Sequence, residues 1–153
     1  MKKYISQQEA LSLLQKYCAY QERCHREVRT KLLSLGIYGE YLEEIIGSLI
    51  EEDYLNEIRF AKTYARGKFR MKAWGRIKII QSLKQKGIND YCIKEAMKEI
   101  NPADYKEALH LILTQQLEKC PDLPPFERKS KAFRYALSRG FESPLIEEFF
   151  GRE

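Results

Sequence analysis

Apolar side chains recur along most of the chain at the three- and four-residue spacing of an amphipathic helix. The clearest stripes consist of Leu11, Leu14, Tyr17 and Cys18, then Leu42, Ile45, Ile46, Leu49 and Ile50, and then Tyr105, Leu109, Ile112 and Leu113. Strict alternation of apolar and polar residues, which is typical of a half-buried strand, does not extend over strand lengths. The pattern therefore predicts an all-α fold.

Three helix starts can be placed from their capping residues. Ser6 is followed three positions later by Glu9, the pattern of a capping box. Asn56 precedes the helical pattern of "EIRFAKTY". Asn101 precedes Pro102, which fits the first turn of a helix because its missing N–H is not needed there. These residues predict helices that begin just after positions 6, 56 and 101.

Helix stops recur with a nearly constant period. Gly36, Gly87 and Gly140 each end an apolar helical pattern, and they are 51 and 53 residues apart. Glycine is favoured there because the residue just past a helix adopts a left-handed backbone conformation. Apolar residues recur at five fixed offsets from these glycines: Val28, Ile79 and Ala132; Leu32, Leu83 and Ala136; Ile37, Ile88 and Phe141; Leu42, Ile93 and Ile146; and Ile46, Met97 and Phe150. The match predicts an internal repeat of helix, helix, glycine turn and helix.

The repeat divides the 153-residue chain into three units. We predict a first three-helix repeat at residues 1–55, a second and basic one at 56–100, and a third at 101–153. The prolines of "CPDLPPF" cannot lie inside a helix, so this segment predicts a loop between the first two helices of the third unit. Units this small must bury apolar faces against one another, so we expect three tandem repeats that form an elongated, curved array.

The second unit concentrates the positive charge of the chain. Residues 59–78, "RFAKTYARGKFRMKAWGRIK", contain eight Lys or Arg residues and no carboxylate. Extension to residue 86 gives ten bases, still without an acid, in a chain of net charge +5. A charge block alone is compatible with a solvated helix face. The complete absence of acids favours a polyanionic partner, because a phosphate-binding surface excludes negative side chains.

Helical spacing arranges these bases into a candidate surface for a phosphate backbone. We predict a helix at 57–70 whose outward stripe carries four of the bases, a basic turn at 67–72, and another helix that starts near Ala73. The candidate binding residues are Arg59, Lys62, Arg66, Lys68, Arg70, Lys72, Arg76 and Lys78. The residues expected to be buried on the second of these helices are Trp74, Ile77, Ile80 and Leu83. Trp74 is therefore interpreted as a core residue rather than as a base-stacking platform.

An acidic block precedes the basic unit. Residues 40–57, "EYLEEIIGSLIEEDYLNE", contain seven Asp or Glu residues and no base. Three interpretations remain open: solvation of the helix, contact with a basic partner surface, or repulsion of phosphate that fixes the polarity of docking.

Residues typical of catalysis or metal binding are sparse. His25 and His110 are far apart, no HExxH, P-loop, GxGxxG or GxSxG motif occurs, and Cys18 and Cys24 lack a second pair at zinc-ligand spacing. We therefore expect no enzyme activity, no metal and no cofactor. The N-terminal "MKKYISQQEA" does not resemble a signal peptide, and no apolar run approaches the roughly 18 residues that a membrane span needs. The expected location is the cytoplasm, with four reduced cysteines and no membrane contact.

Two segments carry an ordered set of residues: "LIEEDYLNEIRFAKTYARGK", which begins just before the second unit, and "WGRIKIIQSLKQKGI", which lies within it. Together they resemble the signature of the RecX family, bacterial regulators of the RecA recombinase. The positions that match the family pattern are Leu55, Arg59, Phe60, Ala61, Gly75, Leu83, Gly87 and Ile88. "REVRTKLLSLGI" and "YALSRGF" extend the similarity to roughly residues 8–150, and the third unit is the least similar. Glu57 stands where aspartate is usual and Asp53 where glycine is common.

The resemblance implies three tandem three-helix repeats and a role as a regulator, mainly an inhibitor, of RecA in DNA repair and the SOS response. Such a protein lies in the helical groove of the RecA filament on single-stranded DNA and modulates ATP hydrolysis, strand exchange and coprotease activity. The implied partner is the RecA filament, bound by a monomer, with direct contact to DNA as a second option. Residues 59–78 are then expected to face the DNA backbone or acidic filament surfaces.

Two other functions remain open on the residues alone. "SLKQKGINDYCIKEAM" could form a helix-turn-helix in a stand-alone DNA-binding module, which tight duplex binding without RecA would favour. The repeats could instead form a scaffold for protein partners only, which binding that hardly depends on salt would favour.

Overall fold

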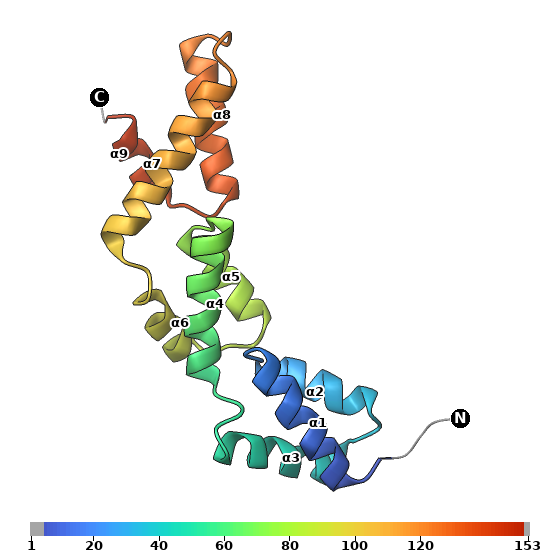
Figure 1. Cartoon of the computed structure of the whole chain (residues 1–153). Coiled ribbons are helices and arrows are strands. Elements are labelled where there is room, and N and C mark those ends of the chain that lie inside the picture. The colour runs from blue at the N-terminus through green and yellow to red at the C-terminus, as the bar shows by residue number, and fades with distance from the viewer. Residues whose placement is uncertain (1–4, 152–153) are drawn as a thin grey trace.

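The computed structural model describes residues 5–151, and in that range the chain forms nine helices and no strand, which confirms the all-α prediction (Figure 1). The helices are α1 (Gln7–Tyr20), α2 (His25–Ser34), α3 (Gly39–Glu51), α4 (Glu57–Lys72), α5 (Arg76–Gln85), α6 (Asp90–Met97), α7 (Pro102–Lys119), α8 (Pro125–Ser138) and α9 (Ser143–Phe149). We refer to α1–α3, α4–α6 and α7–α9 as the first, second and third units. Residues 1–4, which open the segment judged unlike a signal peptide, lie outside the described range, as do residues 152–153.

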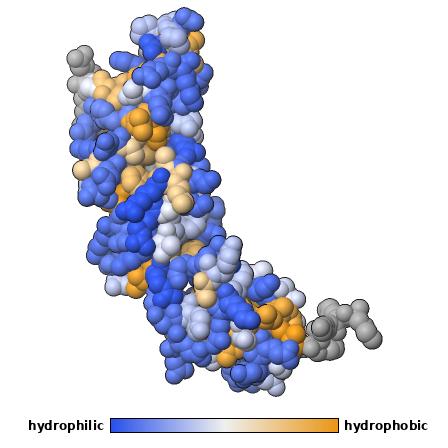
Figure 2. Space-filling model, viewed as in Figure 1, coloured by the Kyte–Doolittle hydropathy of each residue, from blue (hydrophilic) through white to orange (hydrophobic). Residues whose placement is uncertain are grey.

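The three units follow one another in an elongated, bent array (Figure 1), and the space-filling view in Figure 2 shows the same bent shape. The second and third units are stacked end to end, and the first is set at an angle to them. Within each unit all three helices contact one another. The boundaries at residues 55/56 and 100/101 remain our proposal, which this pattern of contacts supports.

The predicted glycine turns share one geometry. The φ angle is +81° at Gly36, +80° at Gly87 and +94° at Gly140. The residue after each glycine donates its backbone N–H to the carbonyl five residues earlier: Ile37 to Leu32 at 3.0 Å, Ile88 to Leu83 at 3.1 Å, and Phe141 to Ala136 at 3.1 Å. This bond closes the helix end as in a Schellman motif. Four of the five repeated apolar positions are buried in every unit, which confirms the repeat.

The predicted helix starts are also confirmed. The Ser6 side chain accepts a hydrogen bond from the Glu9 backbone N–H at 3.1 Å, and the Asn56 side chain accepts one from Arg59 at 2.9 Å. Asn101 caps α7 in the same way, with Pro102 in the first turn. Each bond satisfies a donor that the helix itself leaves free. The predicted proline loop spans residues 120–124, between α7 and α8.

The hydrophobic core has two parts, and they do not follow the three units. One cluster lies within the first unit and includes Leu14, Leu32 and Leu49. The other runs continuously through the second and third units, and Cys24 of the first unit also joins it. The second and third units are therefore one packed body, because burial of a shared apolar surface drives their association.

The joint between the second and third units is made by direct backbone contact. The N-terminus of α5 meets the C-terminal end of α8, where Gly75 N–H donates to the Arg139 carbonyl at 2.7 Å and Ile77 N–H donates to the Gly140 carbonyl at 3.0 Å. Free donors at one helix start thus pair with free acceptors at another helix end. A Cβ on Gly75 would overlap the Gly140 carbonyl, so only glycine allows this approach.

The joint between the first and second units uses side chains instead. The start of α2 faces the end of α5, but the Arg26 guanidinium lies between them, where it donates to the Gln85 carbonyl and lies against Gly87. Beside it, Arg59 of α4 pairs with Glu22 of the first unit at 2.7 Å. This joint is therefore mainly polar, whereas the other is apolar and backbone-bonded.

Two details of the second unit differ from the sequence prediction. Residues 67–72 are helical rather than a turn, because Gly67 lies inside α4 and the left-handed residue that ends the helix is Ala73 (φ +54°). On α5 the fully buried side chains are Ile79 and Leu83, while Ile77 is 42% exposed. The prediction that Ile77 is buried was wrong, because the helix starts at Arg76 and its packed face is the one that carries Ile79 and Leu83.

Candidate functional site

The basic helix α4 and the start of α5 carry all eight predicted binding residues. Because residues 67–72 are helical, the eight do not form a single ridge. Arg59, Lys62, Arg66 and Arg70 share one stripe of α4, as predicted, while Lys68 and Lys72 lie nearly opposite at 100° per residue. The structure therefore separates the basic residues into groups with different surroundings.

Three arginines of the set are engaged by carboxylates from other parts of the chain. Arg59 pairs with Glu22 at 2.7 Å and with Asp53 at 3.1 Å. The hydrogen bond that Arg59 donates to the Glu22 carboxylate raises the pKa of Arg59, so its charge is held firmly in place. The other two pairs are Arg66–Glu99 at 3.3 Å and Arg76–Glu142 at 2.9 Å. These arginines connect elements of the fold, and part of their charge is already neutralised.

The lysines gather around two aromatic rings. The Lys68 Nζ atom lies 4.9 Å from the centroid of the Trp74 ring and 5.4 Å from that of Tyr64. Lys78 Nζ lies 4.7 Å from the Trp74 centroid, and Lys86 Nζ lies 5.6 Å from the Tyr64 centroid. We call these five residues the lysine–aromatic patch. The rings attract the ammonium groups and hold them at the surface without neutralising them.

Lys86 was not among the predicted site residues. Its position in the acid-free run to residue 86 was the available signal, but its approach to Tyr64 of another helix depends on tertiary packing. Trp74 is half-buried and packs against the shared core, consistent with its interpretation as a core residue. The same ring also forms the base of the patch for Lys68 and Lys78.

The remaining predicted bases are Lys62, Arg70 and Lys72. Arg70 and Lys72 are exposed at the end of α4, and Met71 between them is 86% exposed. Within residues 5–151, none of these three bases forms an ion pair with a carboxylate. Their charge is therefore available to a partner, as is that of the patch lysines.

A hollow of about 310 Å³ adjoins the patch where the first and second units meet. Tyr64, Lys68 and Lys86 line it from the second unit, and Glu22 and Glu27 line it from the first. The hollow has mixed charge, so it is not itself a strong anion site. It shows that the patch continues to the polar joint.

The acidic block has a structural role in part. Glu43 pairs with Arg29 at 2.6 Å, and this contact lowers the pKa of the Glu43 carboxyl. Gln7 and Gln15 of α1 donate to Glu44 at 2.7 Å and to Glu52 at 2.8 Å. These contacts tie α1 and α2 to α3. The neighbouring acid Glu40 is exposed on the outer surface of α3, where the open interpretations of the block still apply.

The described residues offer little for chemistry. In residues 5–151 no group of three or more His, Cys, Asp or Glu side chains could hold a metal ion. Burial raises the pKa of the thiols of Cys18, Cys24 and Cys92, which keeps them protonated near neutral pH. No helix of this range is long and apolar enough for a membrane span.

Comparison with known proteins points to one family. The family model described as RecX, second three-helix domain, matches residues 56–97. The regulatory protein RecX of Pelodictyon phaeoclathratiforme is 30% identical over 116 residues, which cover 76% of this chain and 71% of that protein. The regulatory protein RecX of Lactobacillus johnsonii is 30% identical over 147 residues, 96% of this chain. The chain spans 54% of the length of the latter protein and 85% of the RecX of Prosthecochloris aestuarii.

Solved structures agree in fold. The crystal structure of RecX from Lactobacillus salivarius superposes with a TM-score of 0.86 at 25% identity, and the match covers 94% of both chains. A second crystal structure of regulatory protein RecX gives a TM-score of 0.85 and covers 94% of this chain. The similarity thus extends over all three units and not only over the basic one.

Proposed function

The chain belongs to the RecX family, and from that premise we propose that it regulates the RecA recombinase, mainly as an inhibitor, by binding in the groove of the RecA filament on single-stranded DNA. The observation that carries the proposal is the lysine–aromatic patch on the middle of an elongated, bent array (Figure 1). A filament groove is long and curved, and it is lined by repeating subunits and their nucleic acid. A bent array of three units can follow such a groove where a compact domain could not.

The patch lysines are the proposed contacts to phosphate or to acidic filament surfaces. Lys68, Lys78 and Lys86 present ammonium groups on aromatic rings and have no carboxylate partner among residues 5–151. Contacts of this kind release counterions and give affinity without reading the base sequence. We propose Lys62, Arg70 and Lys72 as further contacts. Arg59 and Arg76 are proposed to act mainly by holding neighbouring units together, and Arg66 by tying α4 to Glu99 within the second unit.

The geometry suggests how binding would restrain the filament. The second and third units share one core, so they would contact the groove as a single rigid body. A rigid body that spans neighbouring RecA protomers would resist the relative movement that ATP turnover and strand exchange require. Inhibition would then arise from bridging rather than from occupation of the ATP site.

The decisive experiment measures RecA ATPase activity on single-stranded DNA, titrated with this protein at two salt concentrations, with parallel binding to bare DNA. We expect turnover to fall at protein amounts well below those that coat free DNA, and the effect to weaken at the higher salt concentration. Unchanged turnover despite strong DNA binding would contradict the proposal and favour a stand-alone DNA-binding module.

A charge-reversal variant tests the assigned residues. Lys68→Glu with Lys78→Glu should weaken filament binding and reduce the slope of log affinity against log salt by about 2, because two phosphate contacts are lost. The matched control is Lys16→Glu with Lys119→Glu, which makes the same change in net charge at exposed positions outside the patch. Equal losses in the two variants would mean that only the total charge matters.

The helix-turn-helix alternative would use α6 as the recognition helix. The first turn of α6 carries Asp90, and Glu57 lies next to Asn89 at 3.5 Å. Carboxylates at the start of a recognition helix would oppose phosphate where a helix-turn-helix normally meets DNA. This charge arrangement supports the filament proposal over groove reading by α6.

A further inference from the structure

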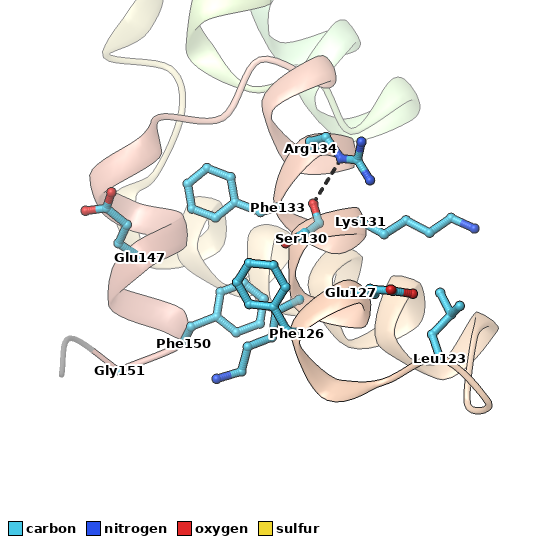
Figure 3. Close-up of a pocket in the computed structure, with 11 residues that line it drawn as sticks. Leu123, Phe126, Glu127, Ser130, Lys131, Phe133, Arg134, Glu147, Phe150 and Gly151 are labelled. Atoms are coloured by element: carbon cyan, nitrogen blue, oxygen red, sulfur yellow. Dashed lines mark hydrogen bonds between the residues drawn. The ribbon is translucent and has the colours of Figure 1, made fainter.

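A groove about 930 Å³ in volume lies between α8 and α9 in the third unit (Figure 3). It lies in the third unit, outside the lysine–aromatic patch of the second, and the proposed function does not use it. Its lining comes from the loop before α8, from α8 itself and from the end of α9. Because the groove is open to solvent, it suits a segment of another protein better than a small molecule that must be enclosed.

The floor of the groove is aromatic. Phe126, Phe133 and Phe150 line it, and Figure 3 shows their rings directed into the space between α8 and α9. Phe133 and Phe150 pack in part against the shared core, so they are anchored. Phe126, by contrast, is 80% exposed. An exposed aromatic side chain beside anchored ones is typical of a binding hot spot, because a partner gains most where it covers large apolar surface.

The rim of the groove is mainly positive. Lys129, Lys131 and Arg134 follow one another along α8, and Lys129 Nζ lies 5.8 Å from the centroid of the Phe150 ring. Lys131 contacts the Cys120 sulfur and Arg134 donates to the Ser130 carbonyl, and neither pairs with a carboxylate among the described residues. Glu127 and Glu147 also line the groove. Figure 3 shows Glu147, Lys131 and Arg134 directed away from the rings, so Lys129, over the Phe150 ring, is the base placed at the aromatic floor.

We propose that this groove binds an acidic amphipathic segment of a partner protein, with Leu or Phe side chains against the three phenylalanines and carboxylates against the bases of α8. Charge complementarity selects this occupant, since unpaired cations attract carboxylates and apolar rings exclude a purely charged chain. The groove would be a second binding site besides the lysine–aromatic patch. This proposal does not depend on the proposed regulation of RecA.

The test uses a synthetic, fluorescently labelled peptide with Leu and Phe at the i, i+3, i+4 and i+7 positions and Glu elsewhere. We expect saturable binding by fluorescence anisotropy, with amide shifts in NMR spectra confined to α8 and α9. Phe126→Ser should weaken binding about tenfold or more, as should Lys129→Glu with Lys131→Glu. Leu111→Ser is the matched control, because it removes a side chain that is 59% exposed on α7 outside the groove and should leave binding unchanged.

Three outcomes would overturn the proposal. Equal affinity for a peptide with Lys in place of Glu would remove the electrostatic argument. Binding of oligo(dT) with the same loss in Phe126→Ser would show that the groove takes nucleic acid. Self-association of the wild-type chain in sedimentation, abolished by Phe126→Ser, would show that a second copy fills it. Thermal unfolding of each variant checks that a loss of peptide binding is not caused by misfolding. We expect unchanged midpoints, because Phe126 and both lysines are exposed.

Discussion

At the scale of single residues, the absence of a side chain matters as much as its presence. Gly75 and Gly140 let two helix ends meet through their backbones, and a Cβ at either position would overlap atoms of the opposite unit. Gly67 has open surroundings instead: apart from its chain neighbours and the backbone of its own helix, no atom of the described residues lies within 4 Å of where its Cβ would be. Glycine is therefore needed at the joint between the second and third units, whereas inside α4 it only lowers the stability of the helix.

Replacement of these glycines by alanine should have opposite effects. We expect Gly75→Ala to lower the free energy of unfolding by about 1–3 kcal/mol, because backbone atoms must separate to admit the methyl group. Gly67→Ala, inside α4, should raise it by roughly 0.5–1 kcal/mol, because alanine loses less backbone entropy in a helix. Urea denaturation of both variants checks this. A neutral Gly75→Ala would mean that the joint is looser than described.

At the scale of elements, a buried tyrosine locks three helices together. Tyr105 of α7 is fully buried, and its hydroxyl accepts from the Arg76 backbone N–H at 2.9 Å and donates to Glu142 before α9. Burial, with the hydrogen bond to Glu142, raises the pKa of Tyr105, so the hydroxyl keeps its proton at pH values where an exposed tyrosine would begin to ionise. The Arg76 guanidinium also lies 3.9 Å from the Tyr105 ring centroid.

Removal of this hydroxyl should destabilise the joint between the second and third units. Tyr105→Phe leaves the Arg76 N–H without its acceptor, and an unsatisfied donor in a buried site costs about 1–3 kcal/mol. Tyr91→Phe is the control, because that side chain is 64% exposed on α6. Thermal unfolding of the two variants gives the comparison, and similar midpoints would show that water replaces the lost bond.

At the scale of the whole molecule, the two joints differ in kind. The joint between the second and third units is apolar and backbone-bonded, while that between the first and second depends on Arg26 and on the Arg59–Glu22 pair. Salt weakens the Arg59–Glu22 pair in part, because its side chains are 38% and 24% accessible and the screening length falls to roughly 3 Å at 1 M. The bend in Figure 1 is therefore located at the joint that salt can loosen.

Distances between spin labels should report this difference. A pair at Ser12→Cys and Lys94→Cys spans the first joint, and a pair at Lys94→Cys and Glu118→Cys spans the second. A Cys120→Ser background removes the partly exposed native thiol, and burial protects the other three cysteines from labelling. We expect the first distance distribution to broaden in high salt or with Arg59→Met, and the second to remain narrow. Equal broadening of both distance distributions would contradict the statement that only the joint between the first and second units is loosened by salt.

The basic residues of the second unit show most clearly what could not be predicted from the sequence. The charge run located an excess of bases in the second unit, because an excess of bases without acids is a property of the chain itself. It could not show that Arg59, Arg66 and Arg76 meet carboxylates from residues 22, 99 and 142, which are distant along the chain. It also could not place Lys86 beside Tyr64.

The sequence by itself determined the helices, their caps, the glycine turns and the threefold repeat, because hydrophobic spacing and capping residues act over a few neighbouring positions. Only the tertiary structure decided how the repeats join. Gly75 and Ile77 in one joint correspond to Cys24 and Arg26 in the other at the 51-residue repeat distance, yet the first joint is closed by backbone and the second by an arginine side chain. The difference arises because helix ends approach only as closely as the side chains between them allow.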